Sequence, residues 1–181
     1  MKVGDCMKVL NAIKNIFLGI LMFVYFAFVI VMTVLLLNYN DYGVTQFGNT
    51  SLIIVNEDIS NNNYKKGDLI IVEKEKMEKL QIGDEIFAYK VDTKGNVNID
   101  LGKIGNLYPE EEAISFENGS NYSMEYVAGS PEKKYEGIGS FLSIVESKWG
   151  FLFIVLVPSF LIFVYEVYTL IVEIKYGQDE D

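Results

Sequence analysis

The sequence predicts a membrane-anchored, mainly β protein, in which a small curled β domain lies between two transmembrane helices. Two long apolar runs, residues 13–37 and 151–174, each exceed the roughly 20 residues that a helix needs to cross a hydrocarbon core. Neither run carries a polar stripe at a period of 3.6 residues, which a helix of a soluble core would show. The stretch between them is polar and holds short β-rich segments separated by turn signals.

The first anchor is expected to follow a short N-terminal segment, residues 1–12, and to cover residues 13–37 without being cleaved. Its apolar run is too long for the core of a signal peptide, and no small-x-small cleavage site follows it. Lysines that favour the cytoplasmic side flank both spans: Lys2, Lys8, Lys14 and Lys175. We therefore expect both termini in the cytoplasm and residues 38–148 outside the cell membrane, with the lipid bilayer as a partner.

The second anchor is expected to cover residues 149–174, with Trp149 at the outer interface and a cytoplasmic acidic tail, residues 175–181, behind it. Pro158 lacks a backbone donor and should bend this helix. Glu166 is a carboxylate well inside the apolar run. A helix that starts at Trp149 brings Glu166 close to the inner headgroups, and a contact with a partner helix is the alternative.

The composition excludes several kinds of function. The chain has 25 acidic and 15 basic residues, all of the latter lysine, and it contains no histidine and no arginine. The usual neutral-pH base, the commonest nitrogen ligand of metals and the bidentate phosphate-binding group are therefore missing. We expect no metal site, no cofactor and no nucleic-acid partner. Cys6 is the only cysteine, so no internal disulfide forms, and lipidation or a plain free thiol both remain open for it.

Six segments of the outer domain are rich in β-branched or aromatic residues and are predicted as strands. They are residues 51–55, 68–72, 85–91, 97–101, 113–116 and 122–127. Gly67-Asp68 and Gly83-Asp84 each stand at the start of a strand. We interpret each glycine as the positive-φ position of a tight turn and each aspartate as the cap of that turn. Helix signals are weak throughout the domain.

Two phrases carry a family resemblance: Lys-Lys-Gly-Asp-Leu-Ile-Ile-Val at residues 65–72 and Gly-Asp-Glu-Ile-Phe-Ala-Tyr at residues 83–89. They resemble type I signal peptidases, in particular the branch with endoplasmic-reticulum-type chemistry in archaea and Gram-positive bacteria. The likeness continues at residues 126–129 and 137–139, at Gly150-Phe151 and at Pro158. It implies a signal-peptidase-like β domain with a peptide-binding cleft, anchored by two helices, that takes part in signal peptide processing and protein secretion.

The same resemblance assigns three catalytic positions. The family uses a serine nucleophile in a Ser-Gly-Ser-Met-x-Pro phrase, a histidine base (lysine in the other branch) and a supporting aspartate in a Gly-Asp phrase. Counted back from Gly67, the nucleophile position is Ile59, while the base falls on Ile99 and the aspartate on Ser120. Isoleucine neither attacks a carbonyl nor accepts a proton. The resemblance therefore implies a peptidase scaffold without catalytic residues, a pseudoenzyme.

Relocated chemistry is the alternative. Ser60 lies one residue beyond the expected nucleophile, and Ser51 would require an insertion before Gly67. Either would need Lys90 or Lys103 as a base. The apolar run around Ser51 is also a candidate for peptide binding by strand addition, although an internal strand fits it equally well. That run is Ser51, Leu52, Ile53, Ile54 and Val55.

Three hypotheses follow. The first is an inactive signal-peptidase-like protein that binds an active signal peptidase or secreted precursor peptides. The second is an active but divergent serine signal peptidase. The third is an envelope scaffold or binding module that shares only the fold. The first is favoured, because the anchors and the strand phrases survive while the catalytic positions do not.

Overall fold

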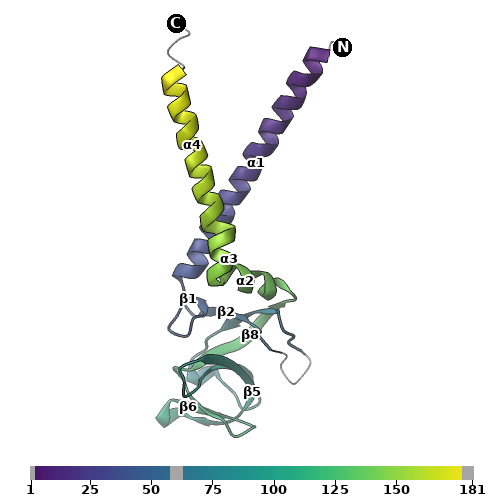
Figure 1. Cartoon of the computed structure of the whole chain (residues 1–181). Coiled ribbons are helices and arrows are strands. Elements are labelled where there is room, and N and C mark those ends of the chain that lie inside the picture. The colour runs from purple at the N-terminus through teal and green to yellow at the C-terminus, as the bar shows by residue number, and fades with distance from the viewer. Residues whose placement is uncertain (1–2, 58–62, 177–181) are drawn as a thin grey trace. The chain divides into compact units, whose positions relative to one another are not determined.

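The computed structural model describes residues 3–57 and 63–176 and divides the chain into two units, Met1–Leu37 and Asn38–Asp181. Helix α1 (Val3–Leu37) forms the first unit (Figure 1). Its segment Ala12–Leu37 has a mean hydropathy of 2.9, and the segment Lys148–Lys175 of the second unit has 2.3. At about 1.5 Å per residue both are longer than the roughly 30 Å of a hydrocarbon core. Both helices are therefore long and apolar enough to cross a membrane.

An eight-stranded antiparallel sheet, curled into a half-barrel, makes up the β domain of the second unit (Figure 1). Its strands are β1 (Thr45–Phe47), β2 (Thr50–Ile54), β3 (Leu69–Glu73), β4 (Glu85–Val91), β5 (Val97–Tyr108), β6 (Ala113–Phe116), β7 (Asn121–Ser123) and β8 (Val127–Tyr135). Their order across the sheet is β1-β2-β3-β8-β4-β5-β6-β7. The 3₁₀ helices η1 (Met77–Lys79) and η2 (Pro109–Glu111) follow β3 and β5.

The predicted strands agree with this sheet in all but one case. The predictions for residues 85–91 and 113–116 match β4 and β6 to the residue, and β2 and β3 each differ from prediction by one residue. Strand β5 runs seven residues past the predicted end at Leu101, to Tyr108. The single strand predicted over residues 122–127 is wrong. The N–H of Tyr126 bonds to the Ser123 carbonyl at 2.9 Å, and this turn separates β7 from β8.

Strand β8 joins the two halves of the sheet. Its C-terminal part pairs with β3 and its N-terminal part pairs with β4. At Gly129, where the strand passes from one partner to the other, φ is +139°. A Cβ at this position would overlap the carbonyl group of Glu73, so only glycine lets the two backbones approach this closely.

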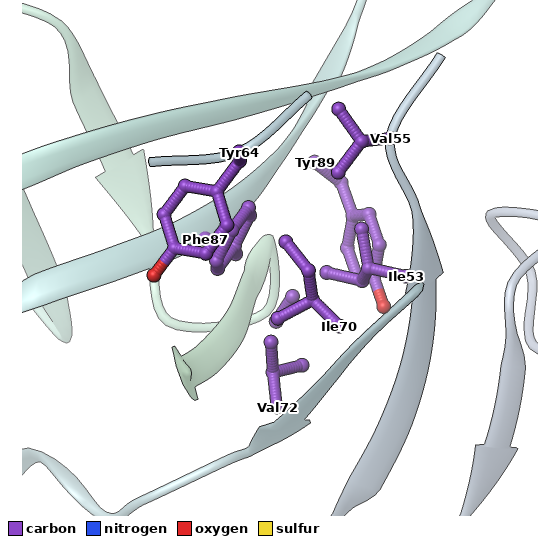
Figure 2. Packing of buried hydrophobic residues seen from close by; sticks show 8 residues of the cluster. Ile53, Val55, Tyr64, Ile70, Val72, Phe87 and Tyr89 are labelled. Atoms are coloured by element: carbon purple, nitrogen blue, oxygen red, sulfur yellow. The ribbon is translucent and has the colours of Figure 1, made fainter. Parts of the chain in front are cut away.

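Among the described residues, the buried apolar side chains form two clusters. The first comprises Ile53, Val55, Tyr64, Ile70, Val72, Phe87, Tyr89 and Ala128, of which Figure 2 labels seven. The Tyr64 ring packs edge-on against Phe87, with centroids 5.4 Å apart, and its hydroxyl donates to Glu85 at 3.1 Å. The second cluster, around Ile86, Ile104 and Ile114, lies between β4, β5 and β6. Phe87 and Tyr89 of β4 belong to the first cluster, and Ile86 and Ala88 belong to the second, so β4 is buried on both faces and lies between the two clusters.

The two Gly-Asp turns have the predicted chemistry. Gly67 and Gly83 have φ of +90° and +95°. The carboxylate of Asp68 accepts the N–H of Lys65 at 2.9 Å, and that of Asp84 accepts the N–H of Gln81 at 2.8 Å. The same four-residue turn therefore precedes both β3 and β4.

These two caps should differ in their contribution to stability. Asp84→Ala removes a solvent-exposed hydrogen bond, and we expect a loss of about 1 kcal/mol in the free energy of unfolding. Asp68 is 3% exposed, and its carboxylate also lies 4.0 Å from the Lys134 ammonium, so Asp68→Ala should cost about 2 kcal/mol. Urea unfolding of both variants in detergent measures the difference. Equal losses would contradict this ranking.

The β domain leads into a helical segment that the sequence did not predict in full. Helix α2 (Ile138–Glu146) is followed by α3 (Lys148–Phe151), the π-helix η3 (Leu152–Leu156) and α4 (Val157–Tyr176). No helix was predicted over residues 138–146, where the structure has α2. A Cβ on Gly139 would lie 2.5 Å from the Asp68 carbonyl oxygen, which places α2 tightly on the Gly67-Asp68 turn. The π-helix η3 ends two residues before Pro158, the residue that is expected to bend this helix.

Candidate functional site: a groove between two strand edges

A groove of about 670 Å³ lies between the C-terminal end of β2 and the N-terminal half of β5. Residues 53–57 line one side, residues 97–103 line the other, and residues 117–118 close one end. The apolar part of the lining includes Ile53, Val55, Ile99 and Leu101. The polar part consists of carboxylates, one lysine and three asparagines. The groove is thus an elongated space with strand backbone on both sides.

The hydrogen bonds of β5 show which of its backbone groups face this groove. In an antiparallel pair, every second residue exchanges bonds with the partner strand, and the residues between them point their N–H and C=O the other way. Two bonds fix the alternation: Asp92 donates to the Asn96 carbonyl at 2.9 Å, and Ile104 donates to the Asp84 carbonyl at 2.9 Å. The even-numbered residues of β5 from 96 to 104 therefore bond to β4.

The odd-numbered residues of β5 point away from β4. The backbone groups of Val97, Ile99 and Leu101 are therefore directed at the edge that lines the groove. The carbonyl of Lys103 follows the same rule, because it accepts the N–H of Glu117 at 2.9 Å on that edge. The pairing of β5 with β6 begins at Ile104, beyond the groove. The N-terminal half of β5 thus presents a strand edge to the groove.

Strand β2 shows the same alternation from the opposite side. Its odd-numbered residues bond to β3, as two hydrogen bonds show: Lys74 to the Asn49 carbonyl at 2.8 Å and Val55 to the Asp68 carbonyl at 2.9 Å. The even-numbered residues face the side of β1, whose described pairing with β2 ends at Leu52. Ile54 and Asn56 lie beyond that end. Their backbone groups are therefore directed into the groove.

A second cavity of about 280 Å³ continues the groove. The two cavities share Ile54, Asn56, Val97 and Ile99. The second cavity extends from these residues to Glu146 and Ser147, at the end of α2. The strand edges and the helix end therefore line one continuous depression.

The first cavity carries an excess of negative charge. Glu57, Asp100 and Glu117 line it, against a single lysine, Lys103. The Tyr122 hydroxyl donates to Asp100 at 2.6 Å. Burial raises the pKa of Tyr122, and its hydrogen bond to the Asp100 carboxylate raises it further, so the phenol stays protonated and holds the carboxylate in place. An acidic lining of this kind favours ligands with positive charge.

Glu146 is a half-buried carboxylate at the far end of the second cavity. The hydroxyls of Tyr39 and Thr45 hydrogen-bond to it. Burial raises the pKa of Glu146, and the two hydrogen bonds oppose that effect only in part. The pKa of Tyr39 is also raised, first by its own burial and then by the charge of Glu146. This cluster ties the segment before β1 to the end of α2.

The raised pKa of Glu146 predicts a pH effect with a defined sign. Because the folded pKa is above the unfolded value, the folded state binds more protons in the window between the two, and stability falls as pH rises through it. Glu146→Gln keeps an acceptor for Tyr39 but cannot ionise. In this variant, the free energy of unfolding should no longer fall as the pH rises above about 4.5. At neutral pH, the variant should be more stable than the unmodified chain by less than about 1 kcal/mol. Thermal unfolding of both proteins between about pH 4 and about pH 8 tests this prediction. A steeper decline in the variant would contradict it.

The structure describes two of the three positions that the family resemblance assigns to catalysis. Ile99 lies in β5 and lines both cavities. Ser120 lies in the turn between β6 and β7, where its side chain hydrogen-bonds to Tyr122. Ile59 and Ser60 lie outside the described residues. The position that the resemblance assigns to the base therefore lies in the groove, and it carries an isoleucine side chain.

The apolar run proposed for peptide binding divides between two environments. Ile53, Ile54 and Val55 line the first cavity, and Leu52 lines the second. Ser51 is 2% exposed and lines neither cavity, although it shares one face of β2 with Ile53 and Val55. Of the lysines considered as a base, Lys103 lines the groove, and Lys90 is exposed on β4.

Sequence reasoning missed the segment that covers one end of the site. The Asn40 carboxamide oxygen accepts the N–H groups of Tyr42 and Val44, each at 3.0 Å, and its nitrogen donates to the Tyr89 hydroxyl at 3.1 Å. The Tyr42 ring stacks on Tyr89 with centroids 4.3 Å apart. Asparagine side chains commonly accept the backbone N–H two residues further on in an Asx turn, so Asn40 was a turn signal in the sequence.

No protein-family model, curated protein or solved structure matches the chain. The likeness to signal peptidases therefore rests on short motifs alone.

Proposed function

We propose that this chain is a two-pass membrane protein whose β domain binds an extended peptide on a signal-peptidase-like scaffold without catalytic residues. The supporting observation is the pair of strand edges that face each other across the groove. A peptide between them would bond to Ile54 on one side and to Ile99 and Leu101 on the other. Strand addition of this kind derives its affinity from main-chain hydrogen bonds.

The chemistry of the groove supports holding a peptide rather than cutting it. A serine hydroxyl attacks a carbonyl only when a neighbouring base takes its proton. The resemblance puts that base at Ile99, whose side chain has no basic atom. Ser51 is buried outside the groove, so it does not supply a substitute nucleophile there. The bound peptide is therefore a secreted precursor or a segment of an active signal peptidase, retained without cleavage.

The acidic lining predicts a preference among peptides. A short extended peptide with lysines should bind about tenfold more tightly than its glutamate counterpart at low ionic strength, because three carboxylates face one ammonium in the groove. Salt screens exposed charges, so the difference should shrink at high ionic strength. Fluorescence polarisation with both labelled peptides measures it. An equal affinity for the two peptides at low salt would show that the acidic lining does not discriminate between peptides by their charge.

The function itself is tested with the full chain in lipid nanodiscs. We expect saturable binding of a labelled extended peptide and no cleavage of a precursor with a small-x-small site, under conditions where an active signal peptidase cleaves it. Cleavage that disappears in Ser51→Ala or Ser60→Ala would instead establish a divergent peptidase. The absence of binding by any peptide, with capture of envelope components from membranes, would support a scaffold.

A further inference from the structure

Helix α2 carries an apolar surface that the β domain does not cover. Ile138, Phe141 and Ile144 are 46%, 54% and 59% exposed. Residues three apart form one stripe along a helix, so these three side chains lie together. Ser140 and Ser143, also three apart, form a separate exposed polar stripe. The exposed surface of α2 is therefore amphipathic in its own right.

The opposite side of α2 is fixed to the sheet. Helix α2 lies against β2 and β3, and the Ser140 N–H donates to the Gly67 carbonyl at 3.0 Å. Gly139 is buried on the Asp68 carbonyl, as described above. The helix therefore cannot turn its apolar stripe inward, and that stripe remains directed away from the domain.

The chain leads from this stripe directly into the second apolar helix. Ser147 is the only residue between α2 and α3, and its extended backbone (φ −65°, ψ 148°) breaks the helix direction there. Its hydroxyl donates to the Ile144 carbonyl at 2.6 Å and accepts the Gly150 N–H at 3.0 Å. A Cβ on Gly150 would overlap the Ile144 carbonyl, so the corner is tight. Trp149, 65% exposed, stands at the start of the candidate span Lys148–Lys175.

We propose that α2 is an interfacial helix whose stripe of Ile138, Phe141 and Ile144 inserts into the outer headgroup region of the same bilayer that the second anchor crosses. A lipid surface is the occupant because the stripe continues, through one residue, into the apolar span and its interfacial tryptophan. Amphipathic helices of this type bury their apolar face about 5–10 Å into the boundary between headgroups and acyl chains. The inference rests on the membrane anchoring proposed above.

The corner between α2 and α3 lines the second cavity, through Ser143, Glu146 and Ser147. An interfacial α2 therefore brings that end of the groove next to the lipid headgroups. A peptide that emerges from the membrane would meet the groove at this end.

The single tryptophan of the chain allows a direct test. The full chain is reconstituted in phosphatidylcholine vesicles with lipids brominated at a shallow acyl position. Three forms are compared: the unmodified chain, which reports Trp149; Trp149→Phe with Phe141→Trp; and Trp149→Phe with Tyr108→Trp. Tyr108 is 43% exposed at the far end of β5 and serves as the matched control.

We expect bromine to quench the Phe141→Trp form at least about threefold more than the Tyr108→Trp form, because only the first residue contacts lipid. Quenching of Trp149 without quenching of Phe141→Trp would overturn the inference and leave the anchoring intact. Quenching of neither would overturn the anchoring as well. A Phe141→Trp emission that ignores bromine but changes on dilution of the protein in lipid would assign the stripe to a second copy and overturn the proposal.

A second measurement uses smaller substitutions and guards against misfolding. Cys6→Ser with Ile144→Cys and Cys6→Ser with Tyr108→Cys are labelled with a membrane-impermeant maleimide. Labelling at Ile144→Cys should be at least about threefold slower than at Tyr108→Cys, because lipid shields the thiol and keeps it protonated. Equal rates would contradict an interfacial α2.

Discussion

Gly129→Ala is expected to destabilise the β domain by about 3 kcal/mol or more. Two costs combine at this position. Alanine at φ +139° is strained by about 1–3 kcal/mol. Its Cβ would also overlap the Glu73 carbonyl, and forcing apart packed backbone costs a further 1–3 kcal/mol or so. Because β8 joins β3 to β4 at this residue, the loss should reach both halves of the sheet.

Gly119→Ala is the matched control for this prediction. Gly119 has φ +86°, but an added Cβ there meets no described atom within 4 Å. It therefore reports backbone strain alone, at about 1–3 kcal/mol. Urea unfolding followed by circular dichroism gives both values. A Gly129→Ala variant no less stable than Gly119→Ala would show that β8 and β3 separate easily at their crossing.

Ile99→Pro is expected to weaken peptide binding about tenfold or more while the domain stays folded. The Ile99 N–H points into the groove and takes no part in the ladder with β4, so proline removes a donor only from the open edge. The loss of one hydrogen bond accounts for about 0.5–1.5 kcal/mol. The ring also occupies space on the edge where the peptide would pair, and about 1.4 kcal/mol corresponds to tenfold.

Two further proline variants make this result specific. Thr93→Pro lies in the turn between β4 and β5, where the Asp92 carboxylate accepts the N–H of Lys94 at 2.7 Å, and proline suits this position. It should bind peptide like the unmodified chain. Asn98→Pro removes a ladder bond to β4 and should destabilise the domain. Full binding by Ile99→Pro would exclude the β5 edge as the peptide site.

The features that were predicted correctly from the sequence depend on residues that are close together in the chain. The Gly-Asp turns before β3 and β4 depend on residues within four positions of each other, and both turns were predicted correctly. Strands β4 and β6 contain β-branched and aromatic residues and have clear turn signals on both sides. Helix α2 was missed because Gly139 and several β-branched or aromatic residues give it weak intrinsic helix propensity, and its formation depends on packing against the Gly67-Asp68 turn.

The groove was beyond sequence reasoning for a different reason. Its existence depends on which strand edges stay open, and that depends on the order of strands that are distant in the chain. The insertion of β8 between β3 and β4 is one such non-local feature. The sequence did identify Ile99 and the run from Leu52 to Val55, all of which line the depression. It did not identify the β5 edge, the Asn40 turn or Glu146.

The alternation of β5 has a consequence for what the protein recognises. A strand that pairs with this edge shows successive side chains to opposite faces, so only every second one reaches the apolar floor formed by Ile53, Val55, Ile99 and Leu101. The side chains at the intervening positions point away from the floor and do not contact it. The groove would select for apolar side chains at every second residue of a ligand, and the other residues could vary freely. Unrelated sequences with this alternation would bind with similar affinity.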